Sequence, residues 1–307
     1  MVKAHDVAYV RYGASDLDKT EKFFTDFGLQ RVSRSDTLLL MRGTGPRPYC
    51  YVAEKSDTPG FRSIGLTANG DLSEATRIEG ASGVENIDWI GGGQRVRVRS
   101  PAGVHYEIVS GVQLTGTLPL RSALVLNPGS SKPRQNKTQR PPRGAAEIIR
   151  LGHCAINVPD TMAEIAWVTT NFGMLVSDYL TDPETKKPIA AFLRMDRGSE
   201  ATDHHSIAIF PSDKMNIHHC SFEIEDLDAL YLGNAHLQQN GHRHHWGIGR
   251  HVLGSQLFDY WFDPDGNRVE HYTDGDVMDV THVPGYVEAT EESLSAWAPP
   301  LPAGFIG

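Results

Sequence analysis

The chain has 307 residues, of which 39% are hydrophobic and 22% charged, so its composition is that of a globular protein with one or two domains. No apolar run reaches the roughly 18 residues that a membrane-spanning helix needs, and the first residues lack the apolar core of a secretory signal. We therefore expect a cytoplasmic protein with no membrane partner. The formal net charge of −9 argues against nucleic acid as a partner, because phosphate binding needs a basic face.

Cysteine and histidine are distributed very differently. The three cysteines, Cys50, Cys154 and Cys220, are too far apart to suggest a disulfide framework or a CxxC zinc motif. The chain has fourteen histidines, but only His5 and His105 precede residue 150. We therefore look for metal or acid–base chemistry in the second half.

The two halves of the chain resemble each other. HDVAYV precedes DLDKTEKFFTDFGL in the first half, and HCAINV precedes PDTMAEIAWVTTNFGM in the second. Each pair predicts a strand, a turn with an Asp and an amphipathic helix that ends at a glycine, Gly28 or Gly173. Later, SPAGVHYEIVSG parallels DPDGNRVEHYTDG, and each places a glutamate, Glu107 or Glu270, on a strand after a turn.

Each half also repeats internally. FRSIGLTANGDLSEATRIEGASG in the first half and IHHCSFEIEDLDALYLGNAHLQQNG in the second are each a further strand, Asp-containing turn and predicted helix. We therefore expect four strand–helix–strands units paired into two domains. This organisation predicts an α+β protein in which curved, mixed sheets surround a cavity.

The second half contains a candidate metal site. GHCAINV and HHCSFEI align so that His153 and His219 occupy the same point of two repeated strands; the alignment favours His219 over His218. Alternate residues share a face of a strand, so the cysteine after each histidine should point into the core. Glu270, on a third strand, is the natural third ligand. Two histidines and one carboxylate form the facial triad of non-haem Fe(II) oxygenases.

The first half lacks part of this set. His5 and Glu107 match His153 and Glu270 in position, but FRSIGLT has no histidine to match His219. We expect His5 and Glu107 to have structural or surface roles. The resulting division is a metal-free N-terminal domain at 1–130, a linker at 131–147, a catalytic C-terminal domain at 148–280 and a tail or lid at 281–307.

Three motifs carry a family resemblance: HHSIAIF, IHHCSFEI and GRHVLGSQLFDYWFDPDGNRVEHY, in this order and after His153. They resemble the type I extradiol ring-cleaving dioxygenases of the vicinal oxygen chelate superfamily, and the resemblance covers nearly the whole chain. It implies four βαβββ modules and Fe(II), or occasionally Mn(II), bound by His153, His219 and Glu270. It also implies O2 and a small aromatic diol as substrates, and a homo-oligomer such as a dimer, tetramer or larger.

The resemblance further implies three residues around the metal, His205, His251 and Tyr260. In the implied reaction the catechol loses one or two protons as it binds, and a neutral histidine is suited to accept or return a proton near pH 7. His205 would stabilise or protonate the reduced oxygen, and Tyr260 would orient the substrate oxygens. The products would be ring-opened semialdehyde acids.

Several alternatives stay open from the sequence. His204 competes with His205, and His244 or His245 competes with His251, for the positions next to the metal. A glyoxalase- or epimerase-like isomerase of the same superfamily is the main rival enzyme, although such sites tend to use more glutamate ligands. A metal-free binding or resistance protein is a rival from another class.

Overall fold

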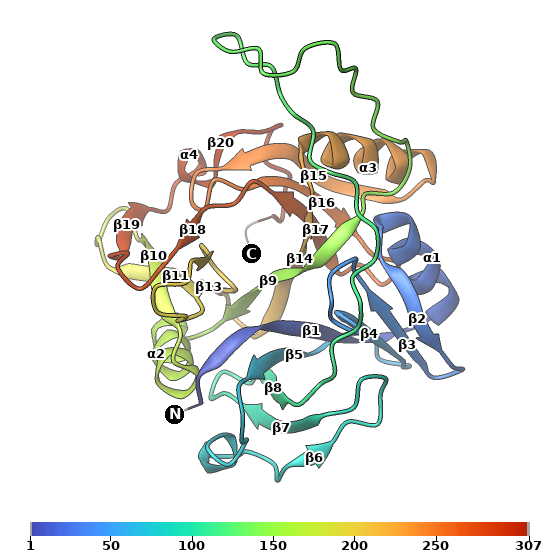
Figure 1. Cartoon of the computed structure of the whole chain (residues 1–307). Coiled ribbons are helices and arrows are strands. Elements are labelled where there is room, and N and C mark those ends of the chain that lie inside the picture. The colour runs from blue at the N-terminus through green and yellow to red at the C-terminus, as the bar shows by residue number, and fades with distance from the viewer. Residues whose placement is uncertain (1, 306–307) are drawn as a thin grey trace.

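Two large curved sheets, one from each half of the chain, form the body of the protein in a computed structural model, which describes residues 2–305 (Figure 1). The N-terminal sheet has the strand order β2-β3-β4-β1-β5-β8-β7-β6. Its strands are β1 Ala4–Ala14, β2 Gln30–Arg34, β3 Leu38–Arg42, β4 Tyr51–Lys55, β5 Gly60–Ala68, β6 Glu85–Asn86, β7 Gln94–Arg99 and β8 His105–Ser110.

The C-terminal sheet has ten strands in the order β19-β10-β11-β13-β9-β14-β17-β16-β15-β20. These are β9 Ile148–Val158, β10 Leu175–Thr181, β11 Pro188–Arg194, β13 Ile207–Pro211, β14 Asn216–Ile224, β15 Arg243–His251, β16 Leu257–Phe262, β17 Arg268–Thr273, β19 Gly285–Glu288 and β20 Ser295–Trp297. Two short strands, β12 Thr202–Asp203 and β18 Val277–Met278, pair separately.

The three long helices lie where the sequence predicts them. They are α1 Leu17–Phe27, α2 Thr161–Phe172 and α3 Leu227–Gln239. An aspartate side chain caps the N-terminus of each, Asp16, Asp160 or Asp226, by accepting backbone N–H groups that would otherwise have no partner. Gly28 and Gly173 end α1 and α2 in the left-handed conformation, as predicted.

The two sheets share one strand plan. Omitting the edge strands β19 and β20, the C-terminal order corresponds position by position to the N-terminal order, with β9 in the place of β1 and β17 in the place of β8. The predicted α+β fold of four βαβββ modules in two curved sheets is therefore confirmed. One prediction was wrong: the helix expected within residues 61–83 is only the short 3-10 turn η1, Ala75–Arg77.

A single hydrophobic core joins the two halves. The ring of Phe27, on α1, stacks on the ring of His271 at 3.7 Å and packs edge-on against Phe222 at 5.8 Å. His271 also donates from Nε2 to the Phe27 carbonyl at 2.6 Å. In the reciprocal contact, the Tyr106 hydroxyl reaches the Glu164 carboxylate on α2 at 3.1 Å. Each half of the chain therefore packs a helix against a strand of the other half.

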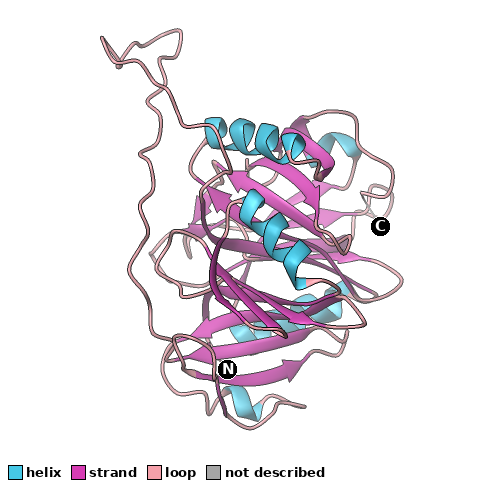
Figure 2. Ribbon diagram, turned by 90° about the vertical axis from the view of Figure 1, so that its right-hand side faces the viewer, coloured by secondary structure: helices cyan, strands magenta, loops and turns pink. Residues whose placement is uncertain are grey.

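Residues 111–147 connect the sheets without forming a helix or strand, and much of this segment projects away from the body (Figures 1 and 2). A bidentate ion pair between Arg121 and Asp226, the capping residue of α3, anchors it. The domain boundaries proposed near residues 130 and 147 remain predictions. Among residues 2–305, none of the helices combines the length and apolar character needed to cross a membrane.

The chain beyond residue 280 closes the C-terminal sheet from both sides. β19 pairs with β10 at one edge, and β20 pairs with β15 at the opposite edge (Figure 1). The short helix α4, Glu291–Leu294, lies between these two strands in the sequence. The tail therefore spans the open side of the curved sheet, and the N-terminal sheet has no counterpart to it among the described residues.

Gly152 on β9 provides a test of this packing. A Cβ atom at this position would overlap the hydroxyl of Tyr272, whose ring lies 5.1 Å from that of His153. Gly152→Ala should therefore lower the free energy of unfolding by about 1–3 kcal/mol, as overpacking does. Gly83→Ala, where the added methyl meets nothing within 4 Å, is the matched control. Equal urea midpoints for the two variants would contradict this reading.

Candidate metal centre

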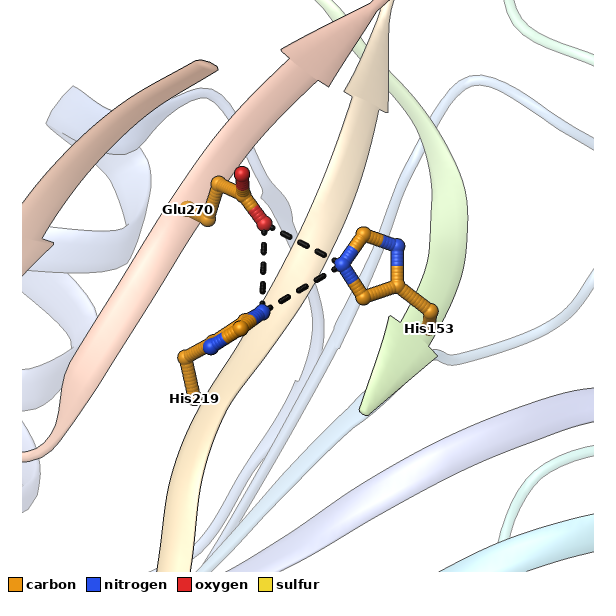
Figure 3. A group of neighbouring side chains, drawn as sticks. All are labelled: His153, His219 and Glu270. Carbon is orange, nitrogen blue, oxygen red and sulfur yellow. Dashed lines mark hydrogen bonds and ion pairs between the residues drawn. The ribbon is translucent and has the colours of Figure 1, made fainter. Parts of the chain in front are cut away.

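Three ligand-type side chains converge inside the C-terminal sheet. His153 on β9, His219 on β14 and Glu270 on β17 come from three adjacent strands and point at one another (Figure 3). The Nε2 atoms of the histidines are 3.3 Å apart, and they lie 3.2 and 3.4 Å from Oε2 of Glu270. All three side chains are buried.

The strand register explains this convergence. β9 and β14 are antiparallel, with His219 opposite Ala155 and His153 opposite Ser221, so the two histidines lie diagonally across one face of the ladder. Ser221 is also level with Glu270 on the parallel strand β17. The cysteines next to each histidine, on the other face, are fully buried in the core, as predicted.

The chemistry of these atoms suits a divalent cation. Both oxygens of Glu270 are buried and accept no hydrogen bond within residues 2–305. Burial raises the pKa of Glu270, but the neighbouring His153 and His251 lower it, and the pKa ends well below its usual value. Burial also lowers the pKa of His219, which keeps its imidazole neutral. An ion centred among the three atoms would lie about 2 Å from each, a normal distance for N and O ligands.

The alignment of His5 with His153 was wrong. The helix caps Asp16 and Asp160 are equivalent, and counting back from them places Tyr9, not His5, at the position of His153. The strand register agrees, since Tyr9 is opposite Gly65, as His153 is opposite Ser221. β1 and β9 begin at equivalent residues, Ala4 and Ile148, and His5 is one residue into its strand whereas His153 is five residues into its own.

With the register corrected, Tyr9, Ser63 and Glu107 occupy the positions of the C-terminal cluster. The Tyr9 hydroxyl donates to Glu107 at 2.7 Å and the Ser63 hydroxyl donates to it at 2.6 Å. The guanidinium groups of Arg11 and Arg95 lie 2.5 and 3.0 Å from the same carboxylate. The buried glutamate of the N-terminal sheet is therefore neutralised by protein groups, whereas Glu270 has no cationic Lys or Arg partner among residues 2–305.

His205 lines the cavity beside the cluster, with its ring centroid 4.2 Å from that of His153. Its neighbour His204 is fully buried and does not line the cavity. Nε2 of His204 is 2.7 Å from the Asp178 carboxylate, so this nitrogen carries a proton and donates it. Nδ1 of His204 then accepts from Nδ1 of His205 at 3.0 Å. These two hydrogen bonds leave Nε2 of His205 as the nitrogen without a proton. Burial lowers the pKa of His205 well below its usual value.

Tyr260 and His251 lie on the opposite side of the cluster, and both line the cavity. Nδ1 of His251 donates to the Leu294 carbonyl at 2.8 Å, which leaves Nε2 to accept the Tyr260 hydroxyl at 2.9 Å. Burial, with the nearby Glu270, raises the pKa of Tyr260 well above its usual value, so the phenol stays protonated.

The competing histidines on β15 do not reach the cavity. His244 binds the Asp259 carboxylate at 2.7 Å, and the ring of His245 packs against Phe262 at 4.4 Å. His218 does line the cavity, although it is not part of the cluster. No motif in the sequence pointed to Asp178, which lies 26 residues before its partner His204.

The comparisons with known proteins agree with the fold and with the position of the site. Residues 150–271, which contain the whole cluster, match the model of the Glyoxalase/Bleomycin resistance protein/Dioxygenase superfamily. Two curated relatives are metapyrocatechase 2 of Cupriavidus necator, 30% identical over 158 residues, and metapyrocatechase of Pseudomonas sp. strain CF600, 28% identical over 195 residues.

These alignments cover 51% and 63% of this chain and 47% and 58% of the relatives, so the chain spans about half the length of the curated relatives that it matches. Among solved structures, homoprotocatechuate 2,3-dioxygenase of Arthrobacter globiformis has a TM-score of 0.81 at 20% identity, covering 99% of this chain and 92% of that one. The Mn(II)-bound glyoxalase of Novosphingobium aromaticivorans has a TM-score of 0.80 at 22% identity, covering 97% and 91%. These likenesses establish the fold.

The contrast between the two glutamates leads to a prediction about metal binding. A divalent metal at 100 times its Kd stabilises a protein by about 2.7 kcal/mol, which should raise the Tm of a chain of this length by about 4 °C. Glu270→Gln and His153→Ala should abolish this increase, because each removes a ligand. Glu107→Gln and His5→Ala should retain the increase in Tm. Its loss in those variants would show that the metal binds in the N-terminal half, contrary to the prediction.

Proposed function

We propose that the protein is an extradiol dioxygenase, which inserts both atoms of O2 into a catechol-type aromatic and opens the ring next to its two hydroxyls, as a step in the degradation of aromatic compounds. The observation that carries the proposal is the buried cluster of His153, His219 and Glu270 at the base of a largely apolar cavity. The similarity of the matched segment to two metapyrocatechases supports it.

His153, His219 and Glu270 would hold Fe(II), the metal that two imidazoles and one carboxylate on one face suit, with Mn(II) as the alternative. When bound, the metal would supply open coordination positions for the two catechol oxygens and for O2. The protein contributes by placing its own proton donors and acceptors around these positions and by excluding water.

His205 would act as the acid–base group. Asp178 and His204 fix its tautomer, so that the proton-free Nε2 faces the cavity and can take a proton that the catechol loses. The same nitrogen can return that proton later in the reaction. His204 and Asp178 would be positioning residues, since they act through His205.

Tyr260 would orient the substrate. Its protonated hydroxyl, 2.9 Å from His251, is a donor that can turn toward a catechol oxygen, and the carbonyl of Leu294 holds His251 in place. Because Leu294 ends helix α4, the tail takes part in positioning this pair.

The isomerase alternative has a neighbour of almost the same structural similarity, so the fold does not choose between the two. The position of the cluster favours the oxygenase, because all three ligand-type residues come from one half of the chain. A neutral His205 and a protonated Tyr260 beside the cluster also fit a reaction that moves protons to and from a catechol.

The direct test is to load the metal-free protein anaerobically with Fe(II), add catechol and then admit O2. We expect stoichiometric O2 uptake and a yellow ring-opened product, with about one Fe(II) per chain. Loading the protein with Mn(II) or Zn(II) instead would show which metal supports O2 uptake and ring opening. A protein that leaves catechols intact with each metal but isomerises the hemithioacetal of methylglyoxal would refute the proposal.

The assignment of His205 has its own test. His205→Phe should keep the metal and still bind catechol, but turnover should fall about 10²–10⁴-fold, the usual contribution of a general acid–base group. His204→Phe should cost less, because it disturbs only the tautomer of His205. Release of hydrogen peroxide, measured in parallel, distinguishes mistimed protonation from loss of folding. A larger defect in His204→Phe would show that the roles are reversed.

A further inference from the structure

The cavity above the cluster has largely apolar walls. Its volume is about 330 Å³, at the lower end of the range for small-ligand pockets. The side chains come from β10, β11, the turn after β15, helix α4 and the tail, and the main apolar ones are Leu180, Ile189, Phe192, Leu253, Leu294 and Phe305. Such a surface favours a substituent that gains from leaving water.

The charged groups around the cavity do not suit an anion. Within residues 2–305, no lysine or arginine lines it, and the acidic Glu291 does. Residues 306 and 307 are Ile and Gly, so they bring no cationic side chain. A carboxylate on the substrate ring would therefore be buried without a partner, which is strongly unfavourable.

One cation does lie next to the cavity, but the tail covers it. Arg268 donates from Nη1 to the carbonyl of Phe305 and from Nη2 to that of Gly304, both at 3.1 Å. The Phe305 ring lies over the guanidinium, 4.7 Å from its Cζ atom, and His218 is 2.6 Å from Nη1 on another side. Nη1 and Nη2 of Arg268 are thus engaged by the tail and by His218, and Nε is buried.

Phe305 is firmly held in this position. Its side chain is only 5% exposed, and its ring packs against Trp246 at 4.5 Å, Tyr260 at 5.0 Å and His218 at 5.2 Å. Because Tyr260 also adjoins the cluster, Phe305 forms the cavity wall close to the place where the substrate ring would bind. The phenyl ring of Phe305 therefore stands between a substituent on the substrate and Arg268.

We infer that the substrates are neutral catechols with an apolar substituent, and that Phe305 excludes catechols carrying a carboxylate by covering Arg268. This inference rests on the proposed ring-cleaving function and adds the substrate class to it. An apolar substituent would pack against the aliphatic and phenyl walls, whereas a carboxylate would lose its hydration without gaining a guanidinium.

The test compares two catechols of the same shape, 4-isobutylcatechol and 3,4-dihydroxyphenylacetate, in which an isopropyl group replaces the carboxylate. We expect kcat/KM of the Fe(II)-loaded protein to be at least about 100-fold higher for the isobutyl compound. Calorimetric titration of the Fe(II)-loaded protein under argon, where no turnover occurs, should show the same preference in Kd. Equal or better use of the acid, in either measurement, would overturn the inference.

The second measurement keeps the two proposals separate. If the isobutyl compound binds more tightly but neither catechol is opened, the proposed function fails and the ligand class stands. If both are opened with the acid preferred, the function stands and the ligand class fails.

Variants of the tail test the role of Phe305. Phe305→Ala removes the ring that lies over the Arg268 guanidinium and leaves only the two backbone carbonyls as its partners in the tail. It should reduce the preference at least tenfold, mainly by improving kcat/KM for the acid. Phe305→Leu keeps an apolar cover and should retain the preference, as its matched control. Adding Arg268→Met to Phe305→Ala should remove the gain for the acid. An unchanged preference in Phe305→Ala would overturn the role of Phe305, and the wild-type comparison does not depend on any variant folding.

Discussion

A carboxylate buried inside a protein must be matched by positive charge or by hydrogen-bond donors, and this constraint organises both sheets. In the N-terminal sheet, Arg11 and Arg95 satisfy Glu107, together with the Tyr9 and Ser63 hydroxyls. In the C-terminal sheet, the equivalent Glu270 faces two histidine nitrogens instead. The same backbone therefore supports a self-neutralised structural site in one half and, as we propose, a cation-requiring site in the other.

This arrangement also explains what could be predicted from the sequence. The repeated His-Cys pair and the Pro-Asp-Gly turn located His153, His219 and Glu270, because strand alternation and internal repetition are local patterns. The alignment of His5 with His153 was wrong because it matched two histidines and ignored the equivalent helix caps, Asp16 and Asp160. The prediction of a helix within residues 61–83 was wrong because a turn signal and an amphipathic pattern do not determine the length of a helix.

Other features had no local signal. Asp178 meets His204 only because β10 and the segment before β13 come together in three dimensions, and no spacing in the sequence reports this. The apolar, Pro-rich end of the chain suggested a packed tail. Its pairing with both edges of the sheet, and the cover it places on Arg268, depend on tertiary contacts alone.

The order of the elements along the chain gives the tail a further consequence. The strands that carry His153, His219 and Glu270 all precede β19 and β20, and the second sheet can assemble its inner strands before its edges are covered. During synthesis, domains generally fold from the N-terminus onward. A chain that folds as it emerges would therefore expose its ligand cluster to metal ions in solution while the cavity is still open. The cavity would close last, when the tail is added.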